Sequence, residues 1–416
     1  MPFKEKEMET GIYARISSYP GIPGKIKSDP EDFMVEEIPI EIPRKPDGKY
    51  LYLRIRLRNW DNNRFLMRLA RELGVSRKRI TYAGTKDKTA VTTQYFCVNT
   101  PSAFEASRLG DVEVLETFRS DRMLKLGDLL GNYFRISIED QEDHDAEIMS
   151  IYDDISSKGG FPNYFGIQRF GSVRTNTHKI GKYIVNGNPD EAVKRYIGDP
   201  DIDTEDFRLE FYRTLDAGEA LKNFPMHLNF ERSLLSHIVE TGDFRSAFAN
   251  FPVNLRMIFV HAYQSYLFNM MVSERFKRMG NLCEVSEGDI AVPVDKYFNP
   301  VVNEGYIKVS RFNIEKISRL SASDRVRVTA PLIGYDTTLS GGLQGEIEAG
   351  IMEKEKVSPE MFRIASDPSM SSSGERRIIS AKPVDLKILE KNTLGFSLGK
   401  GIYATSFLRE ILIDSD

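Results

Sequence analysis

The residues best suited to chemistry lie in a polar segment, 82–94, with the sequence YAGTKDKTAVTTQ. Asp87 stands there between Lys86 and Lys88, and neighbouring cations favour the ionised form of a carboxyl group. An ionised aspartate beside a polyanionic ligand can serve as a nucleophile or as a general base. An ordinary surface turn with a local ion pair is the alternative, and such turns are common. From the residues alone, both interpretations of Asp87 stay open.

A second segment, 163–171, combines aromatic side chains with hydrogen-bonding groups in the sequence NYFGIQRFG. Aromatic rings stack on unpaired bases, and an arginine such as Arg169 binds phosphate or stacks in the same way. Gln168 adds an amide that can read the edge of a base. The alternative is an aromatic turn buried under a sheet, which is at least as common for any one phenylalanine.

The distribution of charge indicates an anionic ligand, although the net charge is −4. No Asp or Glu occurs in residues 155–189, whereas the chain as a whole has 61 of them. A second basic run, Arg77-Lys78-Arg79 followed by Lys86 and Lys88, holds only one acid, Asp87. A polyanion lying across these two basic segments would explain the pattern. Solvated faces of uneven charge are the alternative. The window carries the cations Lys158, Arg169, Arg174, Lys179 and Lys182.

The elements that must position these groups follow from periodicity. Residues 50–57 alternate between apolar and polar side chains, which predicts a half-buried strand that is antiparallel to its neighbours. Asn62 or Asn63 is expected to cap a helix that ends at Gly74. Further strands are expected at 94–98, 133–138, 384–388 and 394–398, and further helices at 146–157 and 255–279.

The 416 residues exceed what a single hydrophobic core usually serves, so two domains are expected. The stretch from about 362 is too short to bury a core and is expected to complete a sheet begun near the N-terminus. We therefore predict a discontinuous α+β domain, 1–172 and 361–416, interrupted by a mainly helical insertion domain, 173–360.

Several protein classes are not indicated by the sequence. No stretch is apolar enough to span a bilayer, no secretory signal is expected, and two cysteines suit a reducing cytoplasm. No zinc spacing or dinucleotide fingerprint occurs, so neither a metal nor a cofactor is predicted. The acids at 199–210 imitate an EF-hand, but Thr204 replaces the required glycine, and we interpret this segment as a solvated acidic loop.

Five ordered motifs together resemble the TruD family of pseudouridine synthases. Segments 84–94 and 163–171 are similar to that family's GTKDK-x-AVT-x-Q and NYFG-x-QRFG signatures. Three further matches are KSDPEDF at 27–33, GNYF at 131–134 and YATS at 403–406 followed by Arg409-Glu410. The insert matches more loosely, chiefly through SYLFN at 265–269.

The resemblance implies a permuted pseudouridine synthase fold, with a mixed, mainly antiparallel sheet and a helical insertion. It also implies a reaction, in which uridine, expected to be uridine 13 of transfer RNA, becomes pseudouridine by breaking the N-glycosidic bond and rejoining the base through carbon. Asp87 takes the catalytic role by position, and Lys27 would pair with it. Asn132 would hydrogen-bond to the base or hold the loop, and Phe134 and Tyr403 would flank the base. Tyr403 stands where the bacterial pattern has phenylalanine, which leaves open whether its hydroxyl takes part.

Two other functions are alternatives to this one. A catalytically inert RNA-binding or chaperone protein on the same fold is disfavoured because Asp87 and Lys27 are both present. A metal-dependent hydrolase using the acids at 199–210 is disfavoured by the missing glycine. We expect a monomeric enzyme that needs RNA as its partner, with Gln168 and Arg169 among the RNA-binding residues, and no membrane.

Overall fold

The computed structural model describes residues 5–102, 112–171 and 173–413 of the chain. The chain forms two compact units, each assembled from separated stretches of the sequence. The sheet unit comprises Ser17–Phe161, Pro293–Glu304 and Ala381–Asp416, and the helical unit comprises Met1–Ile16, Pro162–Val292 and Gly305–Ser380.

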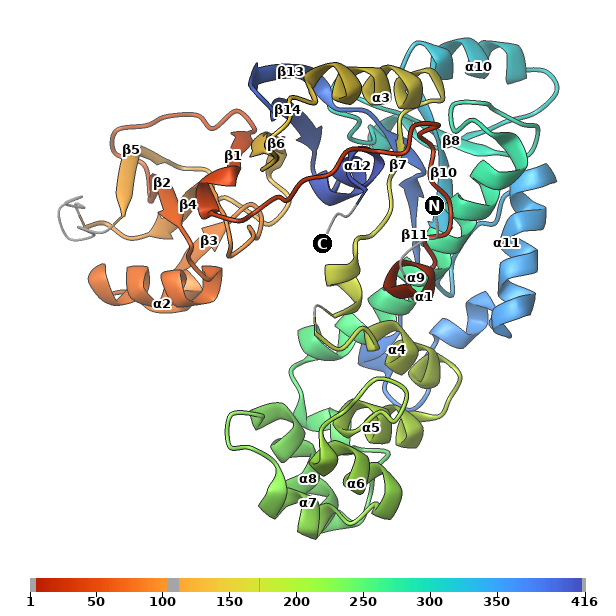
Figure 1. Cartoon of the computed structure of the whole chain (residues 1–416). Helices are drawn as coiled ribbons and strands as arrows, with labels where there is room; N and C mark the ends of the chain where they lie inside the picture. The colour runs from red at the N-terminus through yellow and green to blue at the C-terminus, as the bar shows by residue number, and fades with distance from the viewer. Residues whose placement is uncertain (1–4, 103–111, 172, 414–416) are drawn as a thin grey trace. The chain divides into compact units, whose positions relative to one another are not determined.

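The sheet unit is built on an 8-stranded sheet with the order β13-β14-β6-β1-β4-β2-β5, in which β3 also pairs with β4. Within the described residues β1 runs parallel to β4, and the other pairings in this sheet are antiparallel. This mixed, mainly antiparallel arrangement confirms the predicted α+β class (Figure 1). The strands are β1 (Phe33–Pro39), β2 (Tyr50–Arg58), β3 (Ile80–Tyr82), β4 (Val91–Asn99), β5 (Glu113–Ser120), β6 (Leu129–Ser137), β13 (Val384–Glu390) and β14 (Thr393–Gly399).

Strand β2 shows how this sheet is stabilised by burial on both faces. Leu53, Ile55 and their apolar neighbours of the same face pack in one hydrophobic cluster. Tyr52, on the opposite face, is also fully buried, and its ring stacks on Phe118 at 4.9 Å. The expectation of a half-buried strand is therefore wrong at Tyr52, because buried side chains such as Tyr95 and Leu124 cover this face of the sheet as well.

Helix α2 (Asn62–Glu72) covers one face of the sheet through a cluster of buried apolar side chains. Its Phe65 and Leu66 have no exposed surface, and full burial of one such side chain stabilises a fold by about 1.5–3 kcal/mol. The helix is capped by Asp61, whose carboxylate accepts a hydrogen bond from the Arg64 backbone N–H at 2.9 Å. The predicted cap at Asn62 or Asn63 is therefore wrong by one or two residues, since the helix already begins at Asn62 and the residue before it supplies the capping oxygen.

The C-terminal strands complete the sheet, as expected of a stretch too short to bury a core of its own. Strand β14 pairs along β6, and α12 (Ala404–Ile411) follows it. Helix α3 (Asp145–Ser157) belongs to the same unit. The segment Pro293–Glu304 also joins this unit, because Asn299 donates to the Leu130 carbonyl at 2.7 Å and accepts from the Lys400 N–H at 2.9 Å.

The helical unit is organised around the long helix α9 (Val253–Met279), which was expected from the sequence. Its Arg275 is fully buried and forms an ion pair with Asp289 at 2.7 Å. The other helices of this unit are α1 (Glu5–Glu9), α4 (Thr177–Val185), α5 (Pro189–Ile197), α6 (Asp206–Thr214), α7 (Ala217–Asn223), α8 (Asn229–Thr241), α10 (Ile314–Ala322) and α11 (Gly342–Glu355). A second sheet has the strand order β11-β10-β8-β9, with β8 (Ile290–Pro293), β9 (Ile307–Lys308), β10 (Val326–Leu332) and β11 (Glu375–Ile378). The short strands β7 (Phe161–Pro162) and β12 (Ser380–Ala381) form a two-stranded sheet.

The compact units do not coincide with the predicted boundaries at 172 and 360. Residues 162–171 and 361–380 pack with the helices, as do residues 5–16. For example, the Tyr164 hydroxyl and the Ser273 hydroxyl of α9 are 2.8 Å apart. Such contacts join residues far apart in the sequence, which local patterns do not reveal. In the part of the chain that the structure describes, no helix is long and apolar enough to cross a membrane.

Candidate active site

The loop that carries Asp87 connects β3 to β4 and is fixed at both ends by backbone hydrogen bonds. At its start the Ala83 carbonyl accepts from the Gly127 N–H at 2.7 Å. At its end the Ala90 carbonyl accepts from the Asn59 N–H at 3.0 Å. The loop itself therefore has a defined path, and its Thr85, Lys88 and Thr89 are exposed.

Asp87 forms an ion pair with Lys27, as expected. The Lys27 ammonium group donates to Asp87 Oδ2 at 2.7 Å, and the two side chains are 18% and 39% exposed. The same ammonium group lies 4.1 Å from the centre of the Phe33 ring, a favourable cation–π distance. Asp87 is therefore held in place by a cation and is still accessible to a ligand.

The backbone of Lys27 is unusual, because its φ angle of 63° is rare for a residue with a Cβ atom. Strained conformations of this kind cost about 1–3 kcal/mol and cluster at functional sites. A short helix, Pro30–Asp32, follows, and the Asp29 N–H donates to the Asp32 carboxylate at 2.8 Å. The KSDPEDF motif thus forms a rigid turn that aims Lys27 at Asp87.

Lys86 does not act beside Asp87 in the way the sequence suggested. Its ammonium group lies 3.1 Å from Glu37 Oε2, and the two side chains are only 6% and 1% exposed. The other Glu37 oxygen accepts from the Tyr95 N–H at 3.4 Å. Burial raises the pKa of Glu37 above its ordinary value, and Lys86 opposes this shift. This buried ion pair ties the residue before Asp87 to strand β1.

Sequence reasoning missed Glu37. A signal was present, because Phe33, Val35 and Glu37 alternate on β1 and the first two are buried. A glutamate on a buried face needs a partner, since an unpaired buried charge is costly. The sequence does not show which lysine supplies that partner.

Asn132 and Phe134 lie on β6, on the face of the sheet that they share with Glu37. Phe134 is buried, stacks on Phe396 at 5.5 Å and meets the Phe33 ring edge-on at 6.1 Å. Asn132 pairs in register with Glu37. Its Oδ1 atom is buried and has no hydrogen-bond partner within the described residues, an arrangement that leaves an acceptor for a ligand.

Tyr403 is the residue directly before α12 and is 37% exposed. Helix α12 is held against the sheet, because Phe407 of the helix packs on Phe396 of β14 with ring centres 5.1 Å apart. Phe396 in turn stacks on Phe134. One run of aromatic contacts therefore links the start of β1, near the Lys27–Asp87 pair, to the helix that Tyr403 begins.

Gln168 and Arg169 lie in the helical unit, so they are described separately from Asp87. Gln168 is exposed, whereas Arg169 donates from Nε to the Ser265 hydroxyl at 3.2 Å. The rings of Tyr164, Phe165 and Phe170 in this motif are buried. The hypothesis that these three rings stack on bases is therefore wrong for this conformation, and the alternative of a buried aromatic turn is correct.

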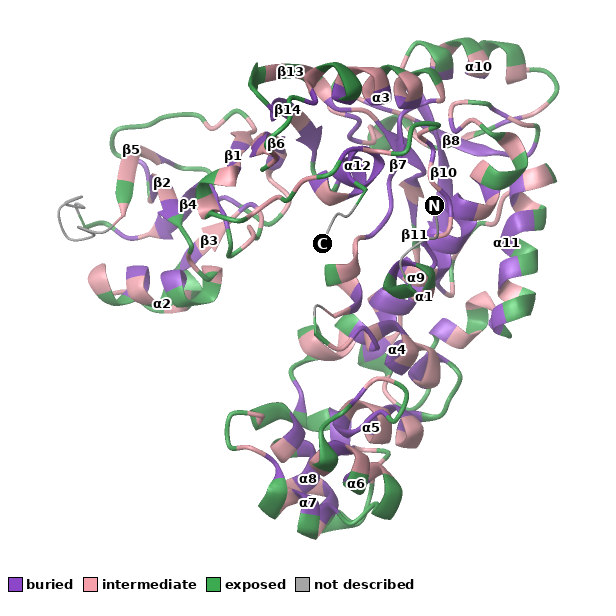
Figure 2. Cartoon of the chain, in the orientation of Figure 1, coloured by how far each residue is buried: buried purple, intermediate pink, exposed green. Residues whose placement is uncertain are grey.

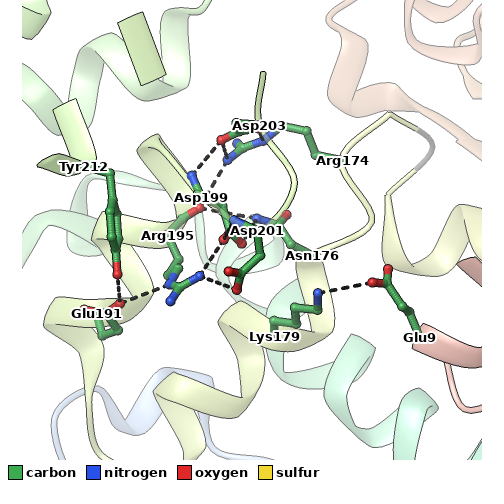
Figure 3. Close-up of polar contacts among 10 residues, drawn as sticks. All are labelled: Glu9, Arg174, Asn176, Lys179, Glu191, Arg195, Asp199, Asp201, Asp203 and Tyr212. Atoms are coloured by element: carbon green, nitrogen blue, oxygen red, sulfur yellow. Dashed lines mark hydrogen bonds and ion pairs between the residues drawn. The ribbon is translucent and has the colours of Figure 1, made fainter. Parts of the chain in front are cut away.

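The acid-free window is not an unpaired basic face. Four of its five cations form ion pairs with carboxylates from elsewhere in the sequence or from its edge, and two of these pairs appear in Figure 3. Most cations of the window are thus neutralised by carboxylates that lie outside it. The pairs are Lys158–Asp154 at 2.8 Å, Arg174–Asp203 at 2.7 Å, Lys179–Glu9 at 3.8 Å and Lys182–Glu355 at 2.8 Å.

The acidic segment near residue 200 was interpreted as a solvated loop, and this is wrong for two of its carboxylates. Asp199 and Asp203 are buried, and Arg174 binds Asp203 through two nitrogens at 2.7 Å (Figure 3). Arg195 donates to Asp199 and to Asp201, each at 2.6 Å. These carboxylates are used as ion-pair partners, and the described residues contain no group of three or more His, Cys, Asp or Glu side chains suited to hold a metal.

A mixed sheet, with an accessible aspartate that is ion-paired to a lysine on a loop beside it, is the arrangement expected of a pseudouridine synthase. The sequence model of the family described as tRNA pseudouridine synthase D (TruD) matches residues 9–411. The chain therefore belongs to the TruD family, and it is an isomerase of the pseudouridine synthase class.

Individual relatives agree over nearly the whole length. Relatives from Picrophilus torridus and Thermoplasma volcanium, both named probable tRNA pseudouridine synthase D, are each 50% identical. The first match covers 97% of this chain and 97% of the relative, and the second covers 93% and 94%. A crystal structure from Methanosarcina mazei that carries the same family name has a TM-score of 0.83 and 35% identity, covering 100% of this chain and 99% of that one.

Proposed function

We propose that this protein converts a uridine of transfer RNA, at position 13, to pseudouridine, with Asp87 as the catalytic carboxylate. The observation that carries the proposal is the Lys27–Asp87 ion pair at 2.7 Å, with the aspartate still 39% exposed. The names of the relatives support transfer RNA as the substrate. The two cysteines, which are both free, suit work in the cytoplasm.

The reaction is an isomerisation, so its atoms balance without a co-reactant. The bond from C1′ to N1 of uracil breaks, the base turns, and a bond from C1′ to C5 forms. The C5 proton leaves and N1 gains a proton. Asp87 can serve this sequence by attacking the sugar, by attacking the base or by removing a 2′ proton, and Lys27 stabilises its negative charge in each case.

The remaining residues are proposed to hold the flipped base. The unpartnered Oδ1 atom of Asn132 supports a hydrogen bond from the N3–H of uracil. Tyr403, which is partly exposed, and Phe134 would flank the base, and Phe134 is kept in orientation by its stacking on Phe396. Gln168 and Arg169 of the helical unit would contact RNA outside the target base. We propose that the protein acts as a monomer and that residues 173–360 form its insertion domain.

The test is Asp87→Asn beside a matched control, Asp121→Asn. Asp121 also belongs to the sheet unit and forms an exposed ion pair, with Lys45 at 2.6 Å. Transfer RNA labelled with tritium at C5 of uridine releases tritium only when the C5–H bond breaks. We expect Asp87→Asn to abolish release while RNA binding and the melting temperature change little, because asparagine keeps the shape of aspartate without its basicity.

The control variant should release tritium at the wild-type rate. Changing uridine 13 of the RNA to cytidine should remove the wild-type signal if the position is correct. Residual Asp87→Asn activity within about tenfold of wild type corresponds to a barrier change of only roughly 1.4 kcal/mol and would place the catalytic role on another residue.

A further inference from the structure

The outer face of α2 is a stripe of cations. The inner face of this helix packs its apolar side chains on the sheet, so the side chains at the opposite positions face outward (Figure 2). Positions 64, 67, 68 and 71 follow the i, i+3, i+4, i+7 spacing of a single helix face. They are occupied by Arg64, Met67, Arg68 and Arg71.

The charge of this stripe continues into the next element. The short helix Arg77–Arg79 follows α2 and consists of Arg, Lys and Arg. Residues 61–79 thus carry six Arg and Lys side chains against two carboxylates, Asp61 and Glu72, in a chain whose net charge is −4. Asp61 is engaged as the cap of α2.

In the described part of the chain, most of these cations have no carboxylate partner. In this they differ from the cations of the acid-free window. Within residues 5–102, 112–171 and 173–413, neither Arg64 nor Arg71 forms an ion pair, and the same holds for Lys78 and Arg79. All four are exposed. Because unpaired cations on one face repel one another, an anionic ligand is the natural complement of this surface.

The single tryptophan of the chain lies at the start of this stripe. The guanidinium groups of Arg64 and Arg68 lie 5.7 and 5.4 Å from the centre of the Trp60 ring. Stacking on an aromatic ring orients a guanidinium group without neutralising its charge. The ring itself is partly exposed and packs edge-on against Phe65 at 5.7 Å.

The stripe begins where the catalytic loop ends. The Asn59 N–H donates to the Ala90 carbonyl at 3.0 Å, and the Gln94 side chain donates to Asn62 Oδ1 at 3.2 Å. From Arg64 to Arg71 the helix then advances by about 10 Å, at 1.5 Å a residue. Neighbouring phosphates of an RNA are spaced at comparable distances. An RNA with one nucleotide at Asp87 can therefore place further phosphates along this part of α2.

We propose that the outer face of α2, continued by Arg77–Arg79, binds the phosphate backbone of the substrate RNA on one side of the target nucleotide. This inference rests on the proposed function only in taking RNA as the substrate. The cations bind phosphates without reading the sequence, and Trp60 holds two of them in position.

The test is the double variant Arg64→Gln/Arg71→Gln in the full-length protein. Glutamine keeps the helix propensity and removes only the charge. If each arginine neutralises one phosphate, the slope of log K against log salt becomes shallower by roughly 0.7–0.9 for each, and the affinity at 0.1 M salt falls by roughly 25-fold or more. Filter binding of an unmodified transfer RNA between 50 and 400 mM salt measures both quantities.

The control is Arg213→Gln/Lys222→Gln, which removes the same charge from two other helices. These side chains are 73% and 74% exposed and pair with Glu210 and Glu219. We expect the control to bind RNA with nearly the wild-type slope. If the two double variants weaken binding equally, the effect is one of net charge and the α2 surface is not a specific contact.

Trp60 offers an independent readout, because it is the only tryptophan. We expect RNA to change its emission at the concentrations that give filter binding, and the change to require more RNA in Arg64→Gln/Arg71→Gln. Bound RNA without any change at Trp60 would overturn the proposal, and an acidic protein would then be the better candidate for this surface. In the tritium-release assay the variant should need more RNA for half-maximal rate, with a much smaller loss at saturating RNA.

The two proposals fail in different ways. If the wild type releases no tritium while the variant still loses RNA affinity, the proposed activity is wrong and the binding surface stands. If the wild type is active and the variant binds and reacts like the control, the surface is wrong and the activity stands.

Discussion

Replacing Glu37 by glutamine would test the buried ion pair that holds the loop carrying Asp87. The change leaves Lys86, which is 6% exposed, without the carboxylate that lies 3.1 Å away. Glutamine keeps an oxygen for the Tyr95 N–H, which donates to Glu37 Oε1 at 3.4 Å. The perturbation therefore removes the charge and preserves the shape.

The size of the effect follows from burial. Removing one partner of a buried pair costs about 3–5 kcal/mol, because the remaining charge is desolvated without compensation. Lys86 has a long side chain on a loop whose neighbour Asp87 is 39% exposed, so it can turn partly to water. We therefore expect a loss of unfolding free energy near the lower end, about 3 kcal/mol.

The double variant Glu37→Gln/Lys86→Met separates charge from position. With neither charge present, most of the stability should return, since replacing a buried pair by neutral groups is often neutral or better. We expect the single variant to lose most tritium release and the double variant to regain part of it. Recovery of stability without any recovery of the rate would mean that the Lys86 charge acts in the chemistry.

The pH dependence of stability gives a second signature. Burial raises the pKa of Glu37 above the ordinary value of 4.5. The folded state therefore holds the proton more tightly than the unfolded state, and Glu37's contribution to stability falls as the pH rises from 4.5 through the folded pKa. Lys86→Met should enlarge this fall because it removes the cation that lowers the pKa, and Glu37→Gln should abolish it.

Urea unfolding followed by Trp60 emission is the appropriate assay, because this residue lies in the sheet unit. A matched control is Glu31→Gln, which removes an exposed pairing with Arg58 and should leave the midpoint nearly unchanged. A loss below about 1 kcal/mol in Glu37→Gln would refute the argument, since a pair worth so little behaves as if it were at the surface.

Three further outcomes follow from the site and its surroundings. Tyr403→Phe should keep most tritium release and Tyr403→Ala should lose most of it, because stacking needs the ring; equal losses would assign a chemical role to the hydroxyl. Release should survive EDTA once the RNA is kept folded by monovalent salt, and restoration by a divalent ion specifically at the enzyme would contradict this. Arg174→Met should destabilise the helical unit by about 3 kcal/mol, as followed by far-UV circular dichroism, because Asp203 is left buried without its ion-pair partner. The dependence of RNA affinity on salt should not change. A shallower salt dependence would instead show that Arg174 binds RNA.

The sequence by itself determined the secondary structure around the site. Alternation predicted β2 and β13, helical spacing predicted α2 and α9, and the ordered motifs predicted the family and the Lys27–Asp87 pair. These predictions succeed because a strand or helix shows its buried face in a period of few residues. A motif likewise preserves the local turn that aims a side chain.

Only the tertiary structure decided which charges are neutralised. Lys86 binds Glu37, which is 49 residues away, and Lys182 binds Glu355, which is 173 residues away. A count of acids within a window does not include such distant partners, so it predicts an RNA face at 155–189 and gives no sign of the cations on the outer face of α2. Ion pairing depends on distance in space and not on distance along the chain. Only the fold therefore determines which cations pair with carboxylates and which are exposed to water.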